Sequence, residues 1–523
     1  MRKNRRKLEI FIFILIFSLS ILLRVWKISE IPLPWVDEIV HGSVLYSSAP
    51  FIFFLGPNLL SLRLPFIILG VLSIVLTYYF FKDFYDKRVA LLASFLLATF
   101  PSHIYFSRVA LPYIGGLSFG MLSLIFIHKF LKTKNRVYLF LFSVVCGIDL
   151  IVRMTLIFFL ATTTILSIKF FNLNFKLKWH DLLISLILFL FSTYPFISIV
   201  SKAGKIIIFF LLKNFPKTIE GTDLSDIGRN LINGLFNTLP QFMKGQMVYY
   251  LQDFSSFLFL ALFIISLIIL LIKFIFKPKL GYKQFKEDIF SLSVIFLTSI
   301  LLSTLTITSF RPGDYLLLSP FFMTIIARGL IEASEYVKKY VRGIFHIFIV
   351  VLILFTFYEA INFLIYFCSF PSIEKITPGS YLFDYVCITS TKSLIESIST
   401  LNYSRIFVDE SNVLPFTLKW YSHGKISEEK INFMLVYTED EETAIEKMIK
   451  KLVEGLEDEN TIYILTSENC LRFGVYHSFY RKISPKNIFL NTIKNFNKSV
   501  ILEKEILSPS GYVMYEIYRV THE

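Results

Sequence analysis

The chain carries a series of apolar runs, each close to the length that crosses a lipid bilayer. The first run occupies residues 8–23, and later runs follow at 59–81, 89–106, 112–131, 137–152, 154–170, 181–200, 254–276, 289–308, 314–331 and 343–368. About 20 apolar residues in a helix span the hydrocarbon core of a bilayer. Phe alone accounts for 58 of the 523 residues, and 55% of the chain is hydrophobic. We therefore expect a polytopic α-helical membrane protein with about 11 transmembrane helices.

Positive charges lie in short segments between the apolar runs rather than along one face. The formal net charge of +14 would otherwise suggest a nucleic-acid partner, and this distribution argues against one. Residues 1–7 contain five basic side chains, and no small-residue cleavage site follows the first run before Arg24. By the positive-inside rule, the N-terminus is cytoplasmic and the loop after the first helix is extracytoplasmic. We expect a multi-pass protein in the plasma membrane of a prokaryote.

Two predicted outer loops and the C-terminal tail interrupt the apolar series. The loops cover residues 24–62 and 201–253, and the mixed composition of the second suits interfacial helices or a lid rather than a span. Residues 370–523 alternate helix-like stretches such as 441–456 with strand-like stretches at 405–408, 432–437, 461–465 and 512–518. The sequence thus predicts a transmembrane module, residues 1–369, followed by a soluble extracytoplasmic α/β domain, residues 370–523.

Ionisable side chains gather at the predicted outer ends of the helices. Asp37 and Glu38 follow the first helix, and the others are Arg63, His103, Arg108, Asp149, Arg153, Arg311 and Asp314. An ionisable residue at membrane depth is costly and by default marks a site or a pathway. Carboxylates and arginines facing one cavity suit a reaction in which an acceptor hydroxyl loses a proton while an anionic leaving group is stabilised. Arginine suits phosphate because its planar guanidinium donates two parallel hydrogen bonds.

Each of these residues also has a purely structural interpretation. Asp37 and Glu38 suit a solvated loop or the N-cap of the following segment. The arginines can extend from helix ends to lipid headgroups. His103 follows a Pro-Ser turn and suits a neutral structural imidazole, whereas Asp149 and Arg153 lie four residues apart and can pair with each other on one helix. The residue types alone leave these alternatives open.

Four segments resemble successive parts of one superfamily of membrane enzymes. They are LPWVDEIVHG at residues 33–42, the stretch from LRLPFIILG to SRVALPY at 62–113, VVCGIDLIVRMTLIFFL at 144–160 and SFRPGDYLLLSPFF at 309–322. In order and spacing they resemble the polytopic GT-C glycosyltransferases, most of all the protein O-mannosyltransferase and aminoarabinose-transferase group. The resemblance covers about residues 8–330 and implies a GT-C-like fold for the transmembrane module.

The resemblance implies transfer of a sugar, such as mannose or another hexose or pentose, from a polyprenyl-phosphate donor. The acceptor would be a hydroxyl on a protein, lipid or glycan at the extracytoplasmic face, and the anomeric centre would invert. Carried over residue by residue, the resemblance makes Asp37 the general base, with Glu38 beside it. Arg311, Arg63 and Arg108 are assigned to the donor phosphate, and His103, Tyr315 and Arg153 to the lining of the site.

Two positions depart from the pattern of the group. Tyr113 stands where many relatives carry a second acid, and three residues separate Arg311 from Tyr315, whereas relatives usually have this arginine and tyrosine together. Some members of the group bind a divalent metal and others do not, so the resemblance is compatible with a divalent metal. No metal ligand is predicted from the sequence. No other cofactor is expected.

Two other functions compete with this interpretation. A multi-pass transporter or flippase for lipid-linked sugars is the alternative, because many helices and intramembrane charges suit it equally well. No paired hydropathy halves with Gly- or Pro-broken helices favour it. An oligosaccharyltransferase catalytic subunit would carry a Trp-Trp-Asp motif, which the four tryptophans (Trp26, Trp35, Trp179 and Trp420) do not form.

Overall fold

The computed structural model describes most of the helices and a C-terminal sheet. The described residues are 2–28, 49–55, 59–152, 163–166, 168, 178–202, 232–233, 237–244, 257–276, 278–305, 312–340, 342–368, 383–408, 426, 431–433, 441–456, 460–466, 485–496, 498–507 and 511–521. Four of the predicted site residues, Asp37, Glu38, Arg153 and Arg311, lie outside them. The chain divides into two compact units, one of residues 1–28 and 64–366 and the other of residues 29–63 and 367–523.

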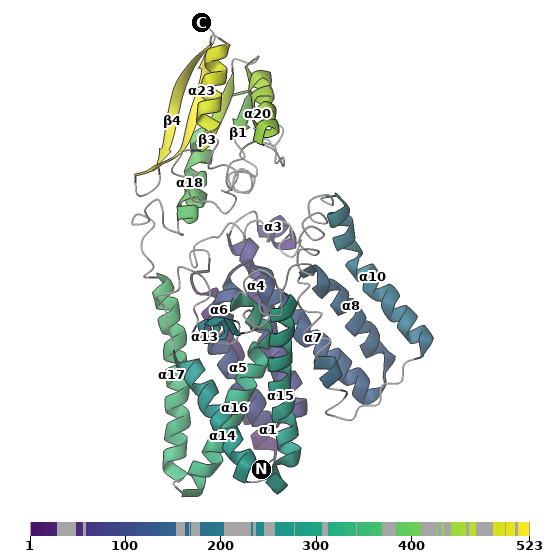
Figure 1. The fold of residues 1–523 in the computed structure, drawn as a ribbon. Helices are drawn as coiled ribbons and strands as arrows, with labels where there is room; N and C mark the ends of the chain where they lie inside the picture. Colours follow the sequence, from purple (N-terminus) through teal and green to yellow (C-terminus); the bar gives the residue numbers. More distant parts are fainter. Residues whose placement is uncertain are drawn as a thin grey trace. The chain divides into compact units, whose positions relative to one another are not determined.

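Long helices that follow the apolar runs build the first unit (Figure 1). Their bounds are α1 Arg2–Val25, α4 Leu59–Phe84, α5 Lys87–Thr99, α6 Pro101–Arg108, α7 Pro112–Thr133, α8 Arg136–Val152, α10 Trp179–Lys202, α14 Leu258–Phe276, α15 Pro278–Leu305, α16 Ser319–Tyr340 and α17 Arg342–Cys368. The first turns of α4, up to Arg63, belong to the second unit. Within the described residues, five helices are long and apolar enough to cross a membrane, or six if the bent pair α5–α6 forms one span. The chain is therefore an integral membrane protein, and the total of 11 spans stays a prediction.

Small residues allow close approach between neighbouring helices. A Cβ added to Gly329 of α16 would lie 2.4 Å from Cβ of Ser266 in α14, and the Ser266 hydroxyl donates to the carbonyl of Ile326 at 3.2 Å. A Cβ on Gly147 of α8 would likewise meet the carbonyl oxygen of Phe189 in α10 at 2.7 Å. Without water to drive association, membrane helices pack through such small side chains and interhelical hydrogen bonds.

The predicted run 89–106 is broken into two helices. Helix α5 ends at Thr99, Phe100 takes an extended conformation with φ −68° and ψ 119°, and α6 begins at Pro101 with a bend of 60°. Proline favours this arrangement because its ring pre-sets the φ angle of the first helical position and disfavours a helical conformation for the preceding residue. The break leaves the last carbonyls of α5 without intrahelical partners, which matters for the site described below.

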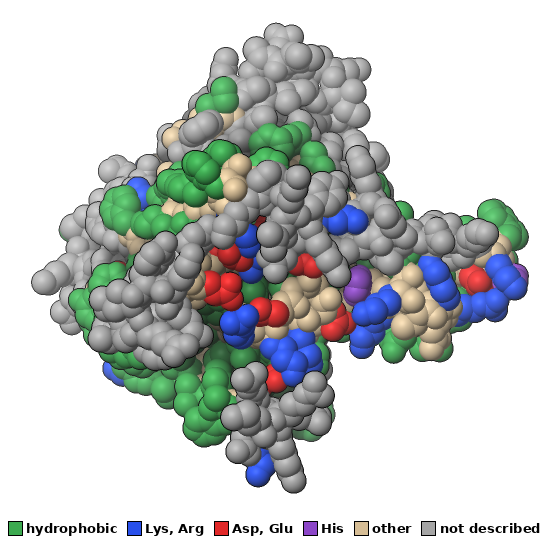
Figure 2. Space-filling view, turned by 90° about the horizontal axis from the view of Figure 1, so that it is seen from below, with side chains coloured by type: hydrophobic (Ala, Val, Ile, Leu, Met, Phe, Trp, Pro, Cys, Tyr) green, Lys and Arg blue, Asp and Glu red, His purple; other side chains and the backbone are tan. Residues whose placement is uncertain are grey.

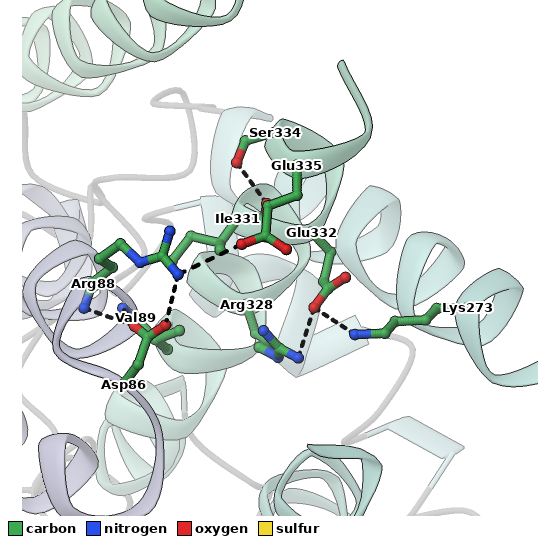
Figure 3. A network of polar contacts seen from close by, with 9 residues as sticks. All are labelled: Asp86, Arg88, Val89, Lys273, Arg328, Ile331, Glu332, Ser334 and Glu335. Carbon is green, nitrogen blue, oxygen red and sulfur yellow. Dashed lines mark hydrogen bonds and ion pairs between the residues drawn. The ribbon is translucent and has the colours of Figure 1, made fainter. Parts of the chain in front are cut away.

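Charged side chains of both signs gather on the end of the first unit at which α1 begins, among hydrophobic ones (Figure 2). A set of largely buried ion pairs at this end is formed by Lys273, Asp288, Arg328 and Glu332, here called the basal ion cluster. Glu332 accepts from Lys273 at 2.5 Å and from Arg328 at 2.7 Å (Figure 3). The Nε atom of Arg328 lies 3.6 Å from Asp288. The cluster therefore joins α14, α15 and α16 at one end of the unit.

The second unit contains a five-stranded mixed sheet in the order β2-β1-β3-β5-β4. The strands are β1 Arg405–Val408, β2 Ile431–Phe433, β3 Thr461–Thr466, β4 Ser499–Leu507 and β5 Val513–Thr521. Strand β1 pairs in parallel with β2 and β3, whereas β5 pairs antiparallel with β3 and β4. The predicted strands at 405–408, 432–437, 461–465 and 512–518 all overlap one of these strands. Helix α3, Ala49–Leu55, also belongs to this unit.

Helices cover both faces of this sheet. Leu394 and Ile398 of α18 (Phe383–Ile398) join Ile406 and Ile464 in a buried cluster on one face. The opposite face is buried by α20 (Glu441–Gly455) and α23 (Pro485–Asn495), with Phe407 at its centre. Successive residues of β1 thus point to opposite cores, as a period of two residues requires. This part of the chain has an α/β/α arrangement, and its location outside the cytoplasm stays a prediction.

Candidate active site

Three short helices form a buried layer at the end of the first unit where α1 ends and α7 begins, here called the loop end. They are α6, α13 (Leu239–Lys244) and the 3-10 helix η3 (Pro312–Leu318), and α6 and α13 are visible near this end in Figure 1. The Ser102 hydroxyl donates to the carbonyl of Phe242 at 2.6 Å and so joins α6 to α13. The Phe242 ring lies 5.2 Å from Phe100 and 6.0 Å from Tyr315 between centroids. Part of the predicted outer loop 201–253 is therefore anchored in this layer.

Arg108, one of the predicted phosphate ligands, binds the C-terminal end of α1. Its Nη1 atom donates to the carbonyls of Leu23 at 3.0 Å and Arg24 at 3.2 Å, and Nη2 donates to the carbonyl of Trp26 at 2.7 Å. The last carbonyls of a helix have no intrahelical donor and carry partial negative charge, so a buried guanidinium suits this place. Arg108 therefore lies at the point where the loop carrying Asp37 leaves α1.

Arg24 binds the C-terminal end of α5 in a similar way. Its Nη1 atom donates to the carbonyl of Ala98, in the last turn of α5, at 3.3 Å and to the carbonyl of Ser20 at 3.0 Å. Its Nη2 atom lies 2.6 Å from Nδ1 of His103. The Arg24 side chain is fully buried. In the sequence Arg24 marks only the end of the first apolar run, because no local pattern shows that the α5–α6 break would need its donors.

The hydrogen bonds of His103 fix its protonation state. Because a guanidinium can only donate, Nδ1 of His103 accepts from Arg24, and the ring proton therefore resides on Nε2. The Nε2 atom lies 2.8 Å from the Ser73 hydroxyl, which in turn donates to the carbonyl of Gly70 at 2.8 Å. The imidazole is thus neutral and joins α1, α4 and α6. Both ring nitrogens are occupied, which supports the structural interpretation of this histidine over acid-base chemistry or metal binding.

Gly70 permits α4 and α6 to approach each other beside this chain of hydrogen bonds. A Cβ added to Gly70 would lie 2.3 Å from the Ser107 hydroxyl oxygen and 3.5 Å from Nε of Arg24. The Ser107 hydroxyl itself donates to the carbonyl of His103 at 2.6 Å. Only a residue without a side chain fits at this position, so the sequence of α4 is constrained by a partner 37 residues further along the chain.

Helix η3 carries two aromatic contacts that bear on the predicted site. The Tyr315 ring is fully buried in the layer and packs against Phe242 and Phe322. Gly313 faces the ring of Tyr113, the second residue of α7, so closely that an added Cβ would lie 2.5 Å from Cε1. Tyr315 is therefore a packed residue of the buried layer and does not line an open cavity. Tyr113 lies against the segment that follows Arg311.

Among the remaining predicted site residues, only Arg63 belongs to the described part of the chain. Arg63 is fully buried in the first turns of α4. Asp37, Glu38, Arg153 and Arg311 fall outside the described residues, so their proposed roles stay predictions. Within the described part of the chain, no group of three His, Cys, Asp or Glu side chains is arranged to hold a metal ion.

Part of the sequence matches a known family. Residues 46–197 match the family model of the dolichyl-phosphate-mannose-protein mannosyltransferases. Comparison with curated protein sequences gives no significant match. The family match covers α4 to α8 and most of α10, and therefore includes Arg63, His103 and Arg108.

Solved structures resemble the chain over almost its whole length. ArnT from Cupriavidus metallidurans in the apo state gives a TM-score of 0.52 at 10% identity and covers 99% of this chain and 98% of ArnT. ArnT bound to undecaprenyl phosphate gives 0.53 at 9% identity, with the same coverage. The oligosaccharyltransferase of Archaeoglobus fulgidus in the apo form gives only 0.47 at 12% identity, covering 91% of this chain and 72% of that protein. The likeness to ArnT shows the fold of this chain.

These findings show which proteins the chain resembles. The chain has the fold of ArnT, and part of its sequence matches the mannosyltransferase family model. The chain therefore resembles the GT-C superfamily of membrane glycosyltransferases, as the order and spacing of its four sequence segments predict.

Proposed function

We propose that this protein is a GT-C type glycosyltransferase that transfers a sugar from a polyprenyl-phosphate donor to a hydroxyl group. The acceptor hydroxyl belongs to a protein, lipid or glycan, and transfer takes place at the extracytoplasmic face of the membrane. The family match over residues 46–197 and the ArnT fold support this proposal. One of the two ArnT structures is bound to undecaprenyl phosphate, which supports a lipid-linked donor for this chain as well.

The observation that carries the proposal is the position of Arg108. Its guanidinium binds the carbonyls of Leu23, Arg24 and Trp26, and Trp26 precedes Asp37 by 11 positions in the sequence. A base that must reach an acceptor hydroxyl needs a rigid support on at least one side. Arg108 supplies that support at the start of the loop, whereas direct contact between Arg108 and the donor phosphate remains part of the proposal.

The proposed reaction is a single displacement with inversion. The acceptor oxygen attacks the anomeric carbon, the bond between that carbon and the donor phosphate oxygen breaks, and Asp37 takes the acceptor proton. Arg311 and Arg63 neutralise the charge that develops on the departing prenyl phosphate, because guanidinium groups bind phosphate oxygens in pairs. Glu38 lies beside the base in the sequence, and the sugar and the acceptor are not specified by any of these residues.

The basal ion cluster favours an enzyme over a transporter or flippase. A carrier that works by alternating access must separate its helices at both ends in turn. Here the end opposite the loop end is joined by ion pairs of Glu332 with Lys273 and Arg328, which opening of this end would have to separate. An enzyme that works from one face has no need to open this end.

Transfer by the purified protein tests the proposal. A panel of radiolabelled polyprenyl-phosphate sugars is offered together with hydroxyl acceptors, and Asp37→Asn is compared with the wild type. We expect Asp37→Asn to lower transfer by about 10²-fold to 10⁴-fold, as is typical when a general base is removed, while undecaprenyl phosphate still binds. Glu38→Gln is the matched control because it changes the neighbouring carboxylate in the same way.

Two outcomes would contradict parts of this proposal. Full transfer by Asp37→Asn would show that Asp37 is not the general base. Absence of transfer and hydrolysis with every donor, in protein whose fold is intact, would favour the transporter interpretation instead.

A further inference from the structure

We propose that Tyr113 is a positioning residue for the donor phosphate and acts through Gly313. This inference rests on the proposed function, and in particular on Arg311 as a phosphate ligand. Tyr113 is the second residue of α7, and Gly313 is the second residue of η3, so the contact joins two elements separated by 200 residues. Neither residue takes part in the proposed displacement itself.

The ring of Tyr113 leaves no room for a side chain at position 313. A Cβ on Gly313 would lie 2.5 Å from Cε1, 2.7 Å from Cδ1 and 2.8 Å from Cζ of Tyr113, so the ring covers the face of Gly313 where a side chain would project. The Tyr113 ring also packs against Phe106 of α6, with 4.8 Å between centroids. The ring therefore contacts both α6 and η3.

This contact fixes the beginning of η3. Arg311 directly precedes this helix in the sequence, and the rest of η3 is buried from Tyr315 to Leu318. The position of a chain segment depends on the packing contacts nearest to it in the sequence. For Arg311, the nearest such contact among the described residues is that of Gly313 with Tyr113. A change at this contact therefore acts two positions from Arg311 in the sequence and removes no group that is proposed to touch the donor. A shift of about 1 Å in a binding group is enough to weaken a charged contact strongly.

The test compares binding of undecaprenyl phosphate with binding of undecaprenol, which has the same chain and no phosphate. Gly313→Ala and Tyr113→Ala should each weaken binding of undecaprenyl phosphate by about tenfold, since a misplaced guanidinium loses part of a charge-assisted contact, and leave undecaprenol binding unchanged. Tyr113→Phe should bind both ligands like the wild type, because the ring and not the hydroxyl covers Gly313. The double variant Gly313→Ala/Tyr113→Ala should be no weaker than the worse single variant, because both changes act on one contact.

Two control variants separate positioning from a general loss of packing. Gly329→Ala introduces an equally close contact on α16, the helix that follows η3, because its Cβ would lie 2.4 Å from Cβ of Ser266. Tyr138→Ala removes another partly exposed tyrosine ring, one that stacks on Phe126 at 6.4 Å. Both controls should lower thermal stability without changing the ratio of the two affinities.

The outcomes distinguish this inference from the proposed function. If the wild type shows no preference for undecaprenyl phosphate over undecaprenol, the proposed donor class is wrong and the inference falls with it. If the wild type shows the preference and Gly313→Ala and Tyr113→Ala keep it, the donor class stands and the inference is wrong. Additive losses in the double variant, or an equal loss in Gly329→Ala, would also overturn the inference.

Discussion

The Nη2 atom of Arg24 lies 2.6 Å from Nδ1 of His103, and this contact connects the end of α1 to the short helix α6. It belongs to a reciprocal arrangement in which Arg24 binds the final turn of α5, while Arg108, at the end of α6, binds the final carbonyls of α1. Two helix ends that would otherwise leave buried carbonyls unsatisfied are thus closed by arginines from neighbouring helices. The same contacts hold the first loop at its starting point.

Substitution of His103 should affect stability rather than proton transfer. His103→Phe removes both hydrogen bonds and leaves the buried donors of Arg24 without this acceptor, at a cost of about 1–3 kcal/mol in the free energy of unfolding. His103→Gln should recover part of the loss, because its amide can accept from Arg24 and donate to Ser73. Thermal unfolding in detergent gives the order of stability of the wild type, His103→Gln and His103→Phe. A His103→Gln protein that is as stable as the wild type but has a changed pH profile of transfer would instead assign His103 to acid-base chemistry.

Arg108→Lys should loosen the C-terminal end of α1. A lysine ammonium has no planar fork with which to reach the carbonyls of Leu23, Arg24 and Trp26 together, so these groups lose donors in a buried place. We expect faster amide hydrogen exchange in residues 20–28 and lower transfer. Arg136→Lys is the matched control, because that side chain is 47% exposed and pairs with Asp181 at 3.2 Å. Unchanged exchange in Arg108→Lys would show that the cap is dispensable.

The sequence predicts the long elements of this fold well. Apolar runs and flanking charges indicate helices close to the bounds of α1, α4, α7 and α17, because bilayer-length apolar segments have few alternatives. The predicted strand 405–408 coincides with β1, whose last three residues form a continuous apolar run because helices cover the sheet on both faces. The apolar pattern does not predict the break at Phe100, although Pro101 is a signal that can reveal it.

The candidate site is predicted less completely, for a physical reason. His103 and Arg108 are identifiable because polar groups stand out among apolar neighbours. Their partners are not, since Arg24 and Ser73 are ordinary residues until the fold brings them within hydrogen-bonding distance. The close approach of Gly313 to Tyr113 has no local signature at all, because the two residues lie 200 positions apart.

Removal of Glu332 should destabilise the helical unit strongly. Its carboxylate accepts from both Lys273 and Arg328, so Glu332→Gln leaves the buried Arg328 and the partly buried Lys273 without their shared counter-ion. Breaking a buried ion pair in this way costs about 3–5 kcal/mol. Thermal unfolding should therefore occur at a clearly lower temperature, while the folded fraction keeps its transfer activity because the cluster lies at the end opposite the loop end.

Glu335→Gln provides the matched comparison three residues further along α16. Its side chain is 54% exposed, and its partner Arg88, 3.5 Å away, is 69% exposed. Solvated pairs of this kind contribute about 0–1 kcal/mol, so this variant should unfold almost like the wild type. Equal effects of the two substitutions would mean that the basal ion cluster is not a buried anchor.

The C-terminal sheet should lose stability in alkaline solution. Lys486 donates to Glu516 at 2.8 Å, and the Tyr518 hydroxyl donates to the other oxygen of the same carboxylate at 2.9 Å. Burial and then the bond to Glu516 raise the pKa of Tyr518, whereas for Lys486 burial opposes the charge but the contacts with Glu516 and Tyr518 raise its pKa overall. A raised pKa in the folded state stabilises the protein below the unfolded pKa, and this contribution is lost as the pH rises through the folded pKa.

Both groups therefore act in the same direction, and the loss should begin above about pH 10, where unfolded tyrosine and lysine titrate. Thermal unfolding of the full chain, followed by circular dichroism from about pH 8 to about pH 11, should show a falling transition for the sheet. Tyr518→Phe removes one of the two titrating groups and should flatten this dependence. A dependence equally steep in Tyr518→Phe and the wild type would assign the alkaline loss to other groups.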